Sequence, residues 1–305
     1  MLFCQLNETS TLGFCVHTLV EHAAIRFYDK IALICANQSL TFGALNCLSN
    51  QLALSLIDQG IGRGQIVAVA LERSPRLVVA LLAVLKTGAA YLPLDLVLPN
   101  QHLRHILNDA SPSCVLVDST SKDLFTPWRS ICFDIDGMQR MPTGARNPNI
   151  NVKVADLAYI TYSSGPAGRP KGVQVTHGAV SNVLCSTMRE VNVNETDRLL
   201  AITAICCDIA VLELFLPLLC GASIVLARTA DTSTPKALLG LMRQYRITTM
   251  QTTPTIWQIL LNQGLQEAPR LANLICNGHK LPQKLAQNLV PFADSKQQSN
   301  GACEE

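Results

Sequence analysis

Apolar residues recur along most of this chain with two alternating periods. Stretches with apolar residues three or four positions apart predict helices, and the compact apolar runs between them predict buried strands. The helical stretches are residues 17–27, 45–56, 76–87, 102–109, 179–188, 211–220, 234–245 and 255–262. The strand-like runs are residues 31–36, 40–42, 66–71, 113–117, 157–162, 199–203, 223–226 and 247–251. This alternation predicts an α/β fold with mainly parallel sheets flanked by helices.

Local signals at the ends of these stretches support the same elements. Ser74 and Pro75 predict a helix start, because serine is a good N-cap and a proline at the first helical position loses no hydrogen bond. Gly88 follows the same helix and is expected to end it.

The periodicity fades between residues 118 and 155, where only 130–135 resembles a strand. We interpret this stretch as a connecting segment or subdomain seam. The α/β rhythm then continues to about residue 290. Residues 291–305 are polar and have no period, which predicts a disordered tail.

Composition narrows the class of protein. The chain has 305 residues, 49% of them apolar, with 24 basic and 22 acidic side chains and a net charge of +2. Without a run of like charges, we expect neither a nucleic-acid nor a membrane surface. The 12 cysteines lack metal-binding spacing, which favours reduced thiols and a cytoplasmic location. The adjacent Cys206 and Cys207 are expected to be buried thiols, since nothing electropositive neighbours them.

The stretch at residues 159–177 is the strongest candidate for chemistry. It reads YITYSSGPAGRPKGVQVTH, an apolar run followed by a glycine-containing loop with one lysine. Such loops present backbone N–H groups and a cation to an anion, most often the phosphates of a nucleotide. The spacing fits neither a P-loop nor the dinucleotide fingerprint.

The loop does match [ST]-[ST]-G-[ST]-[ST]-G-x-P-K-G, the pattern of adenylate-forming enzymes. Other segments match in the same order, at residues 40–95, 206–227, 250–261 and 274–289. Together they cover nearly all of residues 17–290. The chain therefore resembles the AMP-binding superfamily, above all the adenylation domains of nonribosomal peptide synthetases.

The resemblance implies ATP-dependent adenylation of a carboxylate, an amino acid in most such members. ATP with Mg²⁺ would be required, and the acyl group would pass to the phosphopantetheine thiol of a carrier domain. No catalytic or metal-ligating residue of this chain is implied. The positions that match the phosphate-binding loop are Ser163, Ser164, Gly165, Gly168, Lys171 and Gly172.

This loop departs from the family pattern at two positions. Pro166 and Ala167 stand where hydroxyl residues are expected, and Pro166 also lacks a backbone N–H. Each hydrogen bond lost to a charged group is worth about 1.5 to 3 kcal/mol. Phosphate binding is therefore expected to be weaker than in the family.

Asp208 is the second candidate, since the matching aspartate receives the substrate's α-ammonium group in amino-acid-activating members. From the residues alone, Asp208 could equally cap the following helix. By resemblance, the other pocket-lining positions are Leu212, Gln251, Ile275 and Asn277. Three further polar residues are interpreted structurally: Glu213 on an exposed helix stripe, His177 as a hydrogen-bonding histidine and Asp95 in a turn.

Family motifs that normally follow residue 290 are not found. The chain is therefore interpreted as a partial adenylation domain over residues 1–290, without the C-terminal subdomain. Two functions remain open: an adenylating enzyme that needs the remaining part of the domain, or an inactive remnant of the nucleotide-binding fold with at most a binding role.

Overall fold

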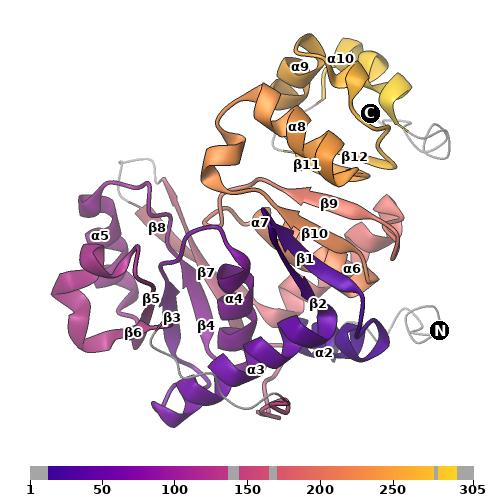
Figure 1. Cartoon of the computed structure of the whole chain (residues 1–305). Coiled ribbons are helices and arrows are strands. Elements are labelled where there is room, and N and C mark those ends of the chain that lie inside the picture. Colours follow the sequence, from indigo (N-terminus) through magenta and orange to yellow (C-terminus); the bar gives the residue numbers. More distant parts are fainter. Residues whose placement is uncertain (1–12, 137–143, 165–169, 278–280, 294–305) are drawn as a thin grey trace.

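The computed structural model describes residues 13–136, 144–164, 170–277 and 281–293. Within these ranges the strands form two six-stranded sheets, which lie side by side in Figure 1. The first sheet has the order β12 (Asn273–Cys276), β11 (Thr249–Thr252), β9 (Arg198–Ala201), β10 (Ser223–Leu226), β1 (Ile31–Cys35) and β2 (Gln38–Thr41). The second has the order β6 (Cys132–Asp134), β5 (Cys114–Val117), β3 (Ile66–Val69), β4 (Ala90–Pro93), β7 (Leu157–Ser164) and β8 (Pro170–Thr176).

The pairing confirms a mainly parallel α/β fold. One pair at the edge of each sheet is antiparallel: β1 with β2, and β7 with β8. Every other neighbouring pair in the two sheets is parallel. The carboxyl ends of parallel strands therefore gather at one edge of each sheet, where α/β proteins commonly bind ligands.

Helices cover the faces of both sheets. They are α2 (Val16–Arg26), α3 (Phe42–Asp58), α4 (Pro75–Thr87), α5 (Asn100–Ala110), α6 (His177–Val191), α7 (Ala210–Cys220), α8 (Pro235–Tyr245), α9 (Pro254–Asn262) and α10 (Gln283–Leu289). Short 3₁₀ segments are η2 (Lys122–Ile131), η3 (Thr229–Thr232), η4 (Leu265–Glu267) and η5 (Val290–Phe292).

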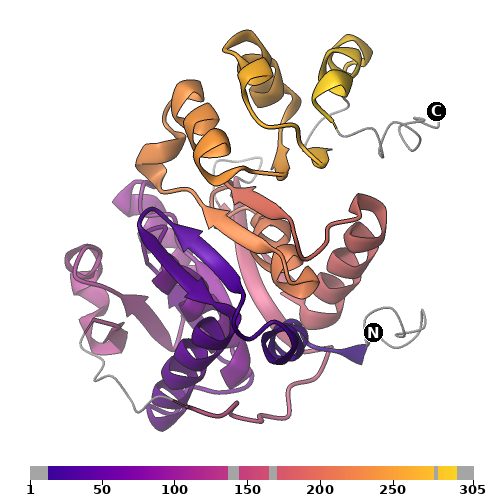
Figure 2. The ribbon, with the colours of Figure 1, turned by 45° about the vertical axis from the view of Figure 1, so that its right-hand side comes forward.

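The main hydrophobic core joins the two sheets through helices. Helix α4 is the most enclosed, since every residue except Arg76 is buried, as expected for a helix that is apolar all round. Side chains of α2, α3, α4 and α7 form one cluster with residues of both sheets. A second cluster lies around β11 and helices α8 to α10, which Figure 2 shows standing away from the second sheet.

The helix ends agree with the sequence signals in all but one respect. Thr41 accepts a hydrogen bond from the Ala44 N–H at 3.1 Å and so caps α3. Pro75 is the first residue of α4, and Gly88 ends it with φ of +82°. Ser74 holds the N-cap position, but its side chain makes no capping hydrogen bond.

Gly221, which ends α7, cannot carry a side chain without strain. Its φ is +75°, and a Cβ atom would lie 2.4 Å from Cε2 of Phe27. We expect Gly221→Ala to lower the free energy of unfolding by about 2 kcal/mol, through strain and overpacking. Gly240→Ala in α8 is the matched control, because no atom lies within 4 Å of its Cβ position. That control should stabilise the chain by about 0.5 kcal/mol. Urea denaturation of both variants tests this, and equal stabilities would contradict it.

No helix in the described ranges is both long enough and apolar enough to cross a membrane.

Candidate functional site

The β7–β8 hairpin carries the candidate phosphate-binding residues. Ser163 pairs with Lys171 and Ser164 with Pro170 across the hairpin. The side chains of Ser163 and Lys171 are exposed. The tip of the hairpin, with the predicted Gly165 and Gly168 and the substitutions Pro166 and Ala167, lies outside the described residues. The structure thus places a hydroxyl and an ammonium group together where the hairpin enters the loop.

The stem of this hairpin is fixed by a tyrosine. Tyr162 donates a hydrogen bond from its hydroxyl to Oδ2 of Asp109 at 2.6 Å, which ties β7 to α5. A Cβ atom on Gly172 would lie 3.1 Å from Cζ of Tyr162. A glycine at position 172 therefore lets the ring pack across the hairpin.

The hairpin meets the connection between β9 and α7, residues 202–209, called here the β9–α7 loop. Thr161 donates a hydrogen bond from its hydroxyl to the carbonyl of Cys206. Tyr159 on β7 and Asp208 in the loop line one cavity. The β7–β8 hairpin of the second sheet and Asp208, which follows β9 of the first, therefore meet at one cavity.

This cavity has a volume of about 210 Å³ and an apolar lining apart from one carboxylate. Among the described residues that form it, Asp208 alone is charged. The lining residues are Tyr159, Val175, Ala179, Val180, Val183, Asp208, Ile209, Val211 and Leu212. Such a cavity suits a ligand with one cationic group and an apolar body.

Asp208 has features of both predicted roles, a helix cap and a ligand for an ammonium group. Its Oδ1 accepts a hydrogen bond from the Ile209 N–H at 2.8 Å, just before α7 begins. The side chain is exposed. Within the described part of the chain, no hydrogen bond involves Oδ2. One oxygen therefore supports the helix start, and the other is available to a ligand.

Three further predicted pocket residues lie on or next to β11 and β12. Gln251 is buried and donates a hydrogen bond from Nε2 to the Ile209 carbonyl at 3.4 Å. Ile275 pairs with Gln251 between β11 and β12. Asn277 continues this ladder with an N–H bond to the Thr252 carbonyl at 3.1 Å. Its Nδ2 is buried without a partner among the described residues. The structure thus connects Gln251 to Ile209, the neighbour of Asp208, and none of these three residues is among those that line the Asp208 cavity.

Glu213 corrects the sequence interpretation, which placed it on an exposed stripe. The side chain is 1% exposed. It accepts hydrogen bonds from the N–H groups of Ile202 and Thr203 at 2.9 and 2.8 Å and from the Thr203 hydroxyl at 2.6 Å. Burial raises the pKa of Glu213 to about 7, although these hydrogen bonds and the charge of Arg73 act to lower it. Glu213 therefore fixes the start of the β9–α7 loop.

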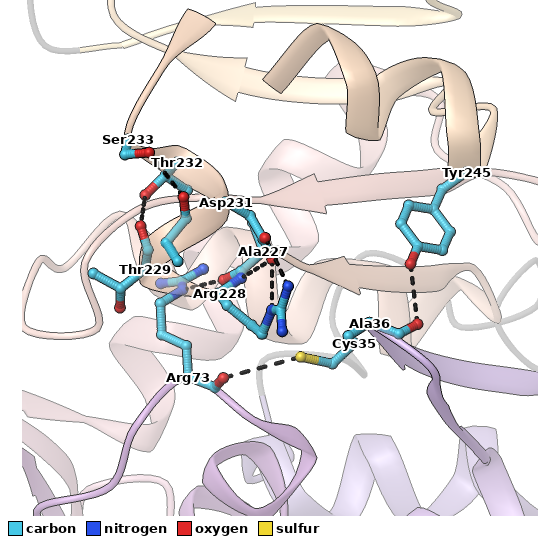
Figure 3. Close-up of polar contacts among 11 residues, drawn as sticks. Cys35, Ala36, Arg73, Ala227, Arg228, Thr229, Asp231, Thr232, Ser233 and Tyr245 are labelled. Carbon is cyan, nitrogen blue, oxygen red and sulfur yellow. Dashed lines mark hydrogen bonds and ion pairs between the residues drawn. The ribbon is translucent and has the colours of Figure 1, made fainter. Parts of the chain in front are cut away.

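Arg73, which the sequence analysis did not single out, fixes the same loop from the opposite sheet. It follows β3, and its guanidinium donates to the carbonyls of Ala201, Thr203 and Ala227. Figure 3 shows it directed at Ala227, while Cys35 Sγ donates to the Arg73 carbonyl at 3.9 Å. The only sequence signal was an arginine two positions after the strand-like run at residues 66–71.

The other two structural interpretations stand. His177 is buried, and its Nδ1 accepts a hydrogen bond from the Val16 N–H at 3.4 Å. Burial lowers the pKa of His177 to about 4, so its imidazole is neutral at physiological pH. Asp95 accepts from the Val97 N–H at 3.0 Å, as in an Asx turn.

The described ranges contain no group of three or more His, Cys, Asp or Glu side chains that could hold a metal ion.

Sequence comparison gives long matches to nonribosomal peptide synthetases. A hybrid PKS-NRPS synthetase of Aspergillus candidus, acdB, is 39% identical over 306 residues, which cover 99% of this chain and 12% of that protein. A dimodular nonribosomal peptide synthase of Bacillus subtilis is 40% identical over 278 residues, 89% of this chain and 12% of that protein. The chain therefore spans about an eighth of the length of these relatives.

Comparison with solved structures also finds nonribosomal peptide synthetases. The nonribosomal peptide synthetase FmoA3 in its AMPPNP-bound form superposes with a TM-score of 0.84 at 25% identity, over 92% of this chain and 30% of that one. A four-domain nonribosomal peptide synthetase bound to AMP and glycine gives a TM-score of 0.80 at 26% identity, over 96% of this chain and 22% of that one.

The family model described as "AMP-binding enzyme" matches residues 20–299. On this match the chain belongs to the AMP-binding enzyme family, and the relatives and solved structures that it resembles are nonribosomal peptide synthetases.

Proposed function

We propose that this chain binds ATP and an amino acid and contributes to formation of the aminoacyl-adenylate, which then passes to a carrier thiol. The observation that carries the proposal is the contact between the two halves of the site. The phosphate hairpin touches the β9–α7 loop through Thr161 and Cys206, and the same loop presents Asp208 in an apolar cavity.

The chemistry of adenylation suits such a site. A substrate carboxylate attacks the α-phosphorus of ATP and pyrophosphate leaves, so the protein must mainly position the reactants and neutralise charge. Lys171 and the Ser163 hydroxyl would meet the phosphates, with the hairpin held by Tyr162. Asp208 would receive the α-ammonium group through Oδ2, and Leu212 would contact the apolar side chain. Mg²⁺ would enter with ATP.

The bound molecules of two relatives support this proposal. The FmoA3 structure matched above contains AMPPNP, an ATP analogue. The four-domain synthetase contains AMP and glycine. Transfer of the acyl group to a phosphopantetheine carrier is part of the same proposal. It is proposed and not observed, since the chain spans only a small part of those proteins.

A matched pair of ligands tests the role of Asp208. We expect the chain to bind a non-hydrolysable aminoacyl-adenylate analogue, and Asp208→Asn to weaken binding about tenfold to a hundredfold. The reason is the loss of a charge-assisted hydrogen bond worth about 1.5 to 3 kcal/mol. The same analogue without its α-amino group should bind the wild type and the variant equally.

Isothermal titration calorimetry across a panel of amino acid side chains gives these affinities, and amino-acid-dependent ATP–pyrophosphate exchange reports activity. Equal affinity of Asp208→Asn and the wild type for the amino-containing analogue would overturn the assignment of Asp208. The absence of binding to every analogue would overturn the proposed function. Binding without exchange would support the binding role alone.

A further inference from the structure

The β9–α7 loop contains two adjacent thiols that the proposed function does not use. Cys207 is exposed and Cys206 is partly buried. Of the ten cysteines that the structure describes, Cys207 is the one classed as exposed. The expectation that both are buried thiols is therefore wrong for Cys207.

The two side chains of this pair interact. The side chains of Cys206 and Cys207 lie within hydrogen-bonding reach of each other. This contact lowers the pKa of Cys207 to about 7, although burial and the carboxylates of Asp208, Asp95 and Glu213 act in the opposite direction. The same contact, together with burial, raises the pKa of Cys206. The exposed sulfur is thus the more acidic of the two, and the protonated thiol lies against it.

The backbone holds the pair in a tight turn. The Cys207 N–H donates to the Ala204 carbonyl at 3.0 Å, and the Cys207 carbonyl accepts from the Ala210 N–H at 3.0 Å. Thr161 binds the carbonyl of Cys206 from the neighbouring sheet. The backbone of both cysteines is therefore held in place from two sides.

Other cysteines of the described chain do not combine an exposed side chain with a lowered pKa. Cys114 is buried, Cys220 is partly buried, and burial raises the pKa of each to about 12. Because thiolate is the reactive form, both are poor nucleophiles at neutral pH. Selective attack on an electrophile is therefore expected at Cys207.

We propose that Cys207 is a site of thiol modification by low-molecular-weight disulfides, and that Cys206 is its resolving thiol. In the first step, the Cys207 thiolate attacks one sulfur of the disulfide, forming a mixed disulfide and releasing one thiolate. In the second, Cys206 gives up its proton and attacks the Cys207 sulfur, releasing the second small thiol. The balance is one disulfide and two protein thiols to one Cys206–Cys207 disulfide and two small thiols.

The position of the pair gives this reaction a consequence. Cys207 directly precedes Asp208, and residues of the same loop line two cavities: Ala204 and Ile205 one of about 320 Å³, and Asp208 and Ile209 the cavity of about 210 Å³. A disulfide bond between the two sulfurs closes a ring that includes the peptide bond joining Cys206 and Cys207. It therefore changes the backbone just before Asp208. The chemistry itself does not depend on the proposed function.

Mass spectrometry of the folded 305-residue chain, treated with oxidised glutathione at pH 7, tests the proposal. In the wild type, we expect Cys207 to react first and the peptide to end with a Cys206–Cys207 disulfide and no glutathione. Both Cys206→Ser and Cys206→Ala should stop at the glutathionylated Cys207. The serine variant retains a hydroxyl donor, so its first step should be faster than that of the alanine variant. Cys207→Ser should leave the peptide unmodified.

Cys220 lies in the same tryptic peptide and is an internal control, located by fragmentation. We expect Cys207 to react more than about tenfold faster than Cys220, which is partly buried and mostly protonated at neutral pH. Equal labelling of these two cysteines would overturn the assignment of Cys207. A wild-type chain that retains glutathione as stably as Cys206→Ser would overturn the role of Cys206.

Discussion

Arg73→Ala should lower the free energy of unfolding by about 4 kcal/mol. The guanidinium is largely buried between the sheets and donates hydrogen bonds to three carbonyls, at 2.6 Å to Ala227 and 2.7 Å to Ala201, with the third to Thr203. Truncation removes the side-chain donor from all three carbonyls, of which that of Ala201 keeps the N–H of Ala227 at 3.1 Å, and leaves Glu213 without a nearby cation. Breaking a buried polar network in this way costs about 3 to 5 kcal/mol.

Arg76→Ala is the matched control, three residues along the same chain. Its side chain is 59% exposed and pairs with Asp136 on the surface, and an exposed ion pair contributes less than about 1 kcal/mol. Arg73→Lys should recover only part of the loss, since one ammonium cannot reproduce the fork of Nε and two terminal nitrogens. Urea denaturation at pH 7.5 measures all three variants. If Arg73→Ala and Arg76→Ala lower the free energy of unfolding equally, the contact between the second sheet and the β9–α7 loop does not depend on Arg73.

The same substitution bears on the proposed function. Arg73 binds the carbonyl of Thr203 in the β9–α7 loop, and Asp208 lies at the other end of that loop. The second sheet therefore supports the loop at two points, through Arg73 and through Thr161. The position of the Asp208 carboxylate therefore depends on the packing of the two sheets, and not on its own sheet alone.

The sequence predicted the elements well because their signals are local. The helix expected at residues 76–87 is α4, with Pro75 at its first position and Gly88 at its end. Strand-like runs at residues 66–71 and 223–226 became β3 and β10. The ordered motifs also identified the family, which the family model and the relatives confirm.

The hydrogen bonds that Arg73 and Glu213 make to the β9–α7 loop could not be predicted, because they join residues far apart in the chain. Glu213 occupies a helix whose pattern allowed an exposed stripe, and only the fold shows that β9 delivers Ile202 and Thr203 to its carboxylate. Cys207 was expected to be a buried thiol because nothing electropositive neighbours it in the sequence, but the turn before α7 exposes it. The roles of the phosphate-loop and pocket residues stay predictions.

Glu213→Ala should lower the free energy of unfolding by about 3 kcal/mol at pH 7.5. Two backbone N–H groups and the Thr203 hydroxyl lose their acceptor, and a buried donor without a partner costs about 1 to 3 kcal/mol. Glu190→Ala, at an exposed position of α6, is the control and should change stability by less than about 0.5 kcal/mol. Equal losses in the two variants would contradict this role.

Glu213→Gln separates the charge from the hydrogen bonds. The pKa of Glu213 is about 7 in the folded chain, raised by burial from its ordinary value of 4.5, so the folded state binds the proton more tightly than the unfolded state. The resulting stability is fully present below about pH 4.5 and is lost as the pH rises through 7. Glutamine does not titrate, so the wild type should lose up to about 3 kcal/mol relative to Glu213→Gln between pH 5 and pH 8. His17 and His177, whose pKa values burial lowers, titrate in both proteins and cancel in this difference. A difference in the free energy of unfolding that does not change with pH would show that Glu213 stays ionised throughout.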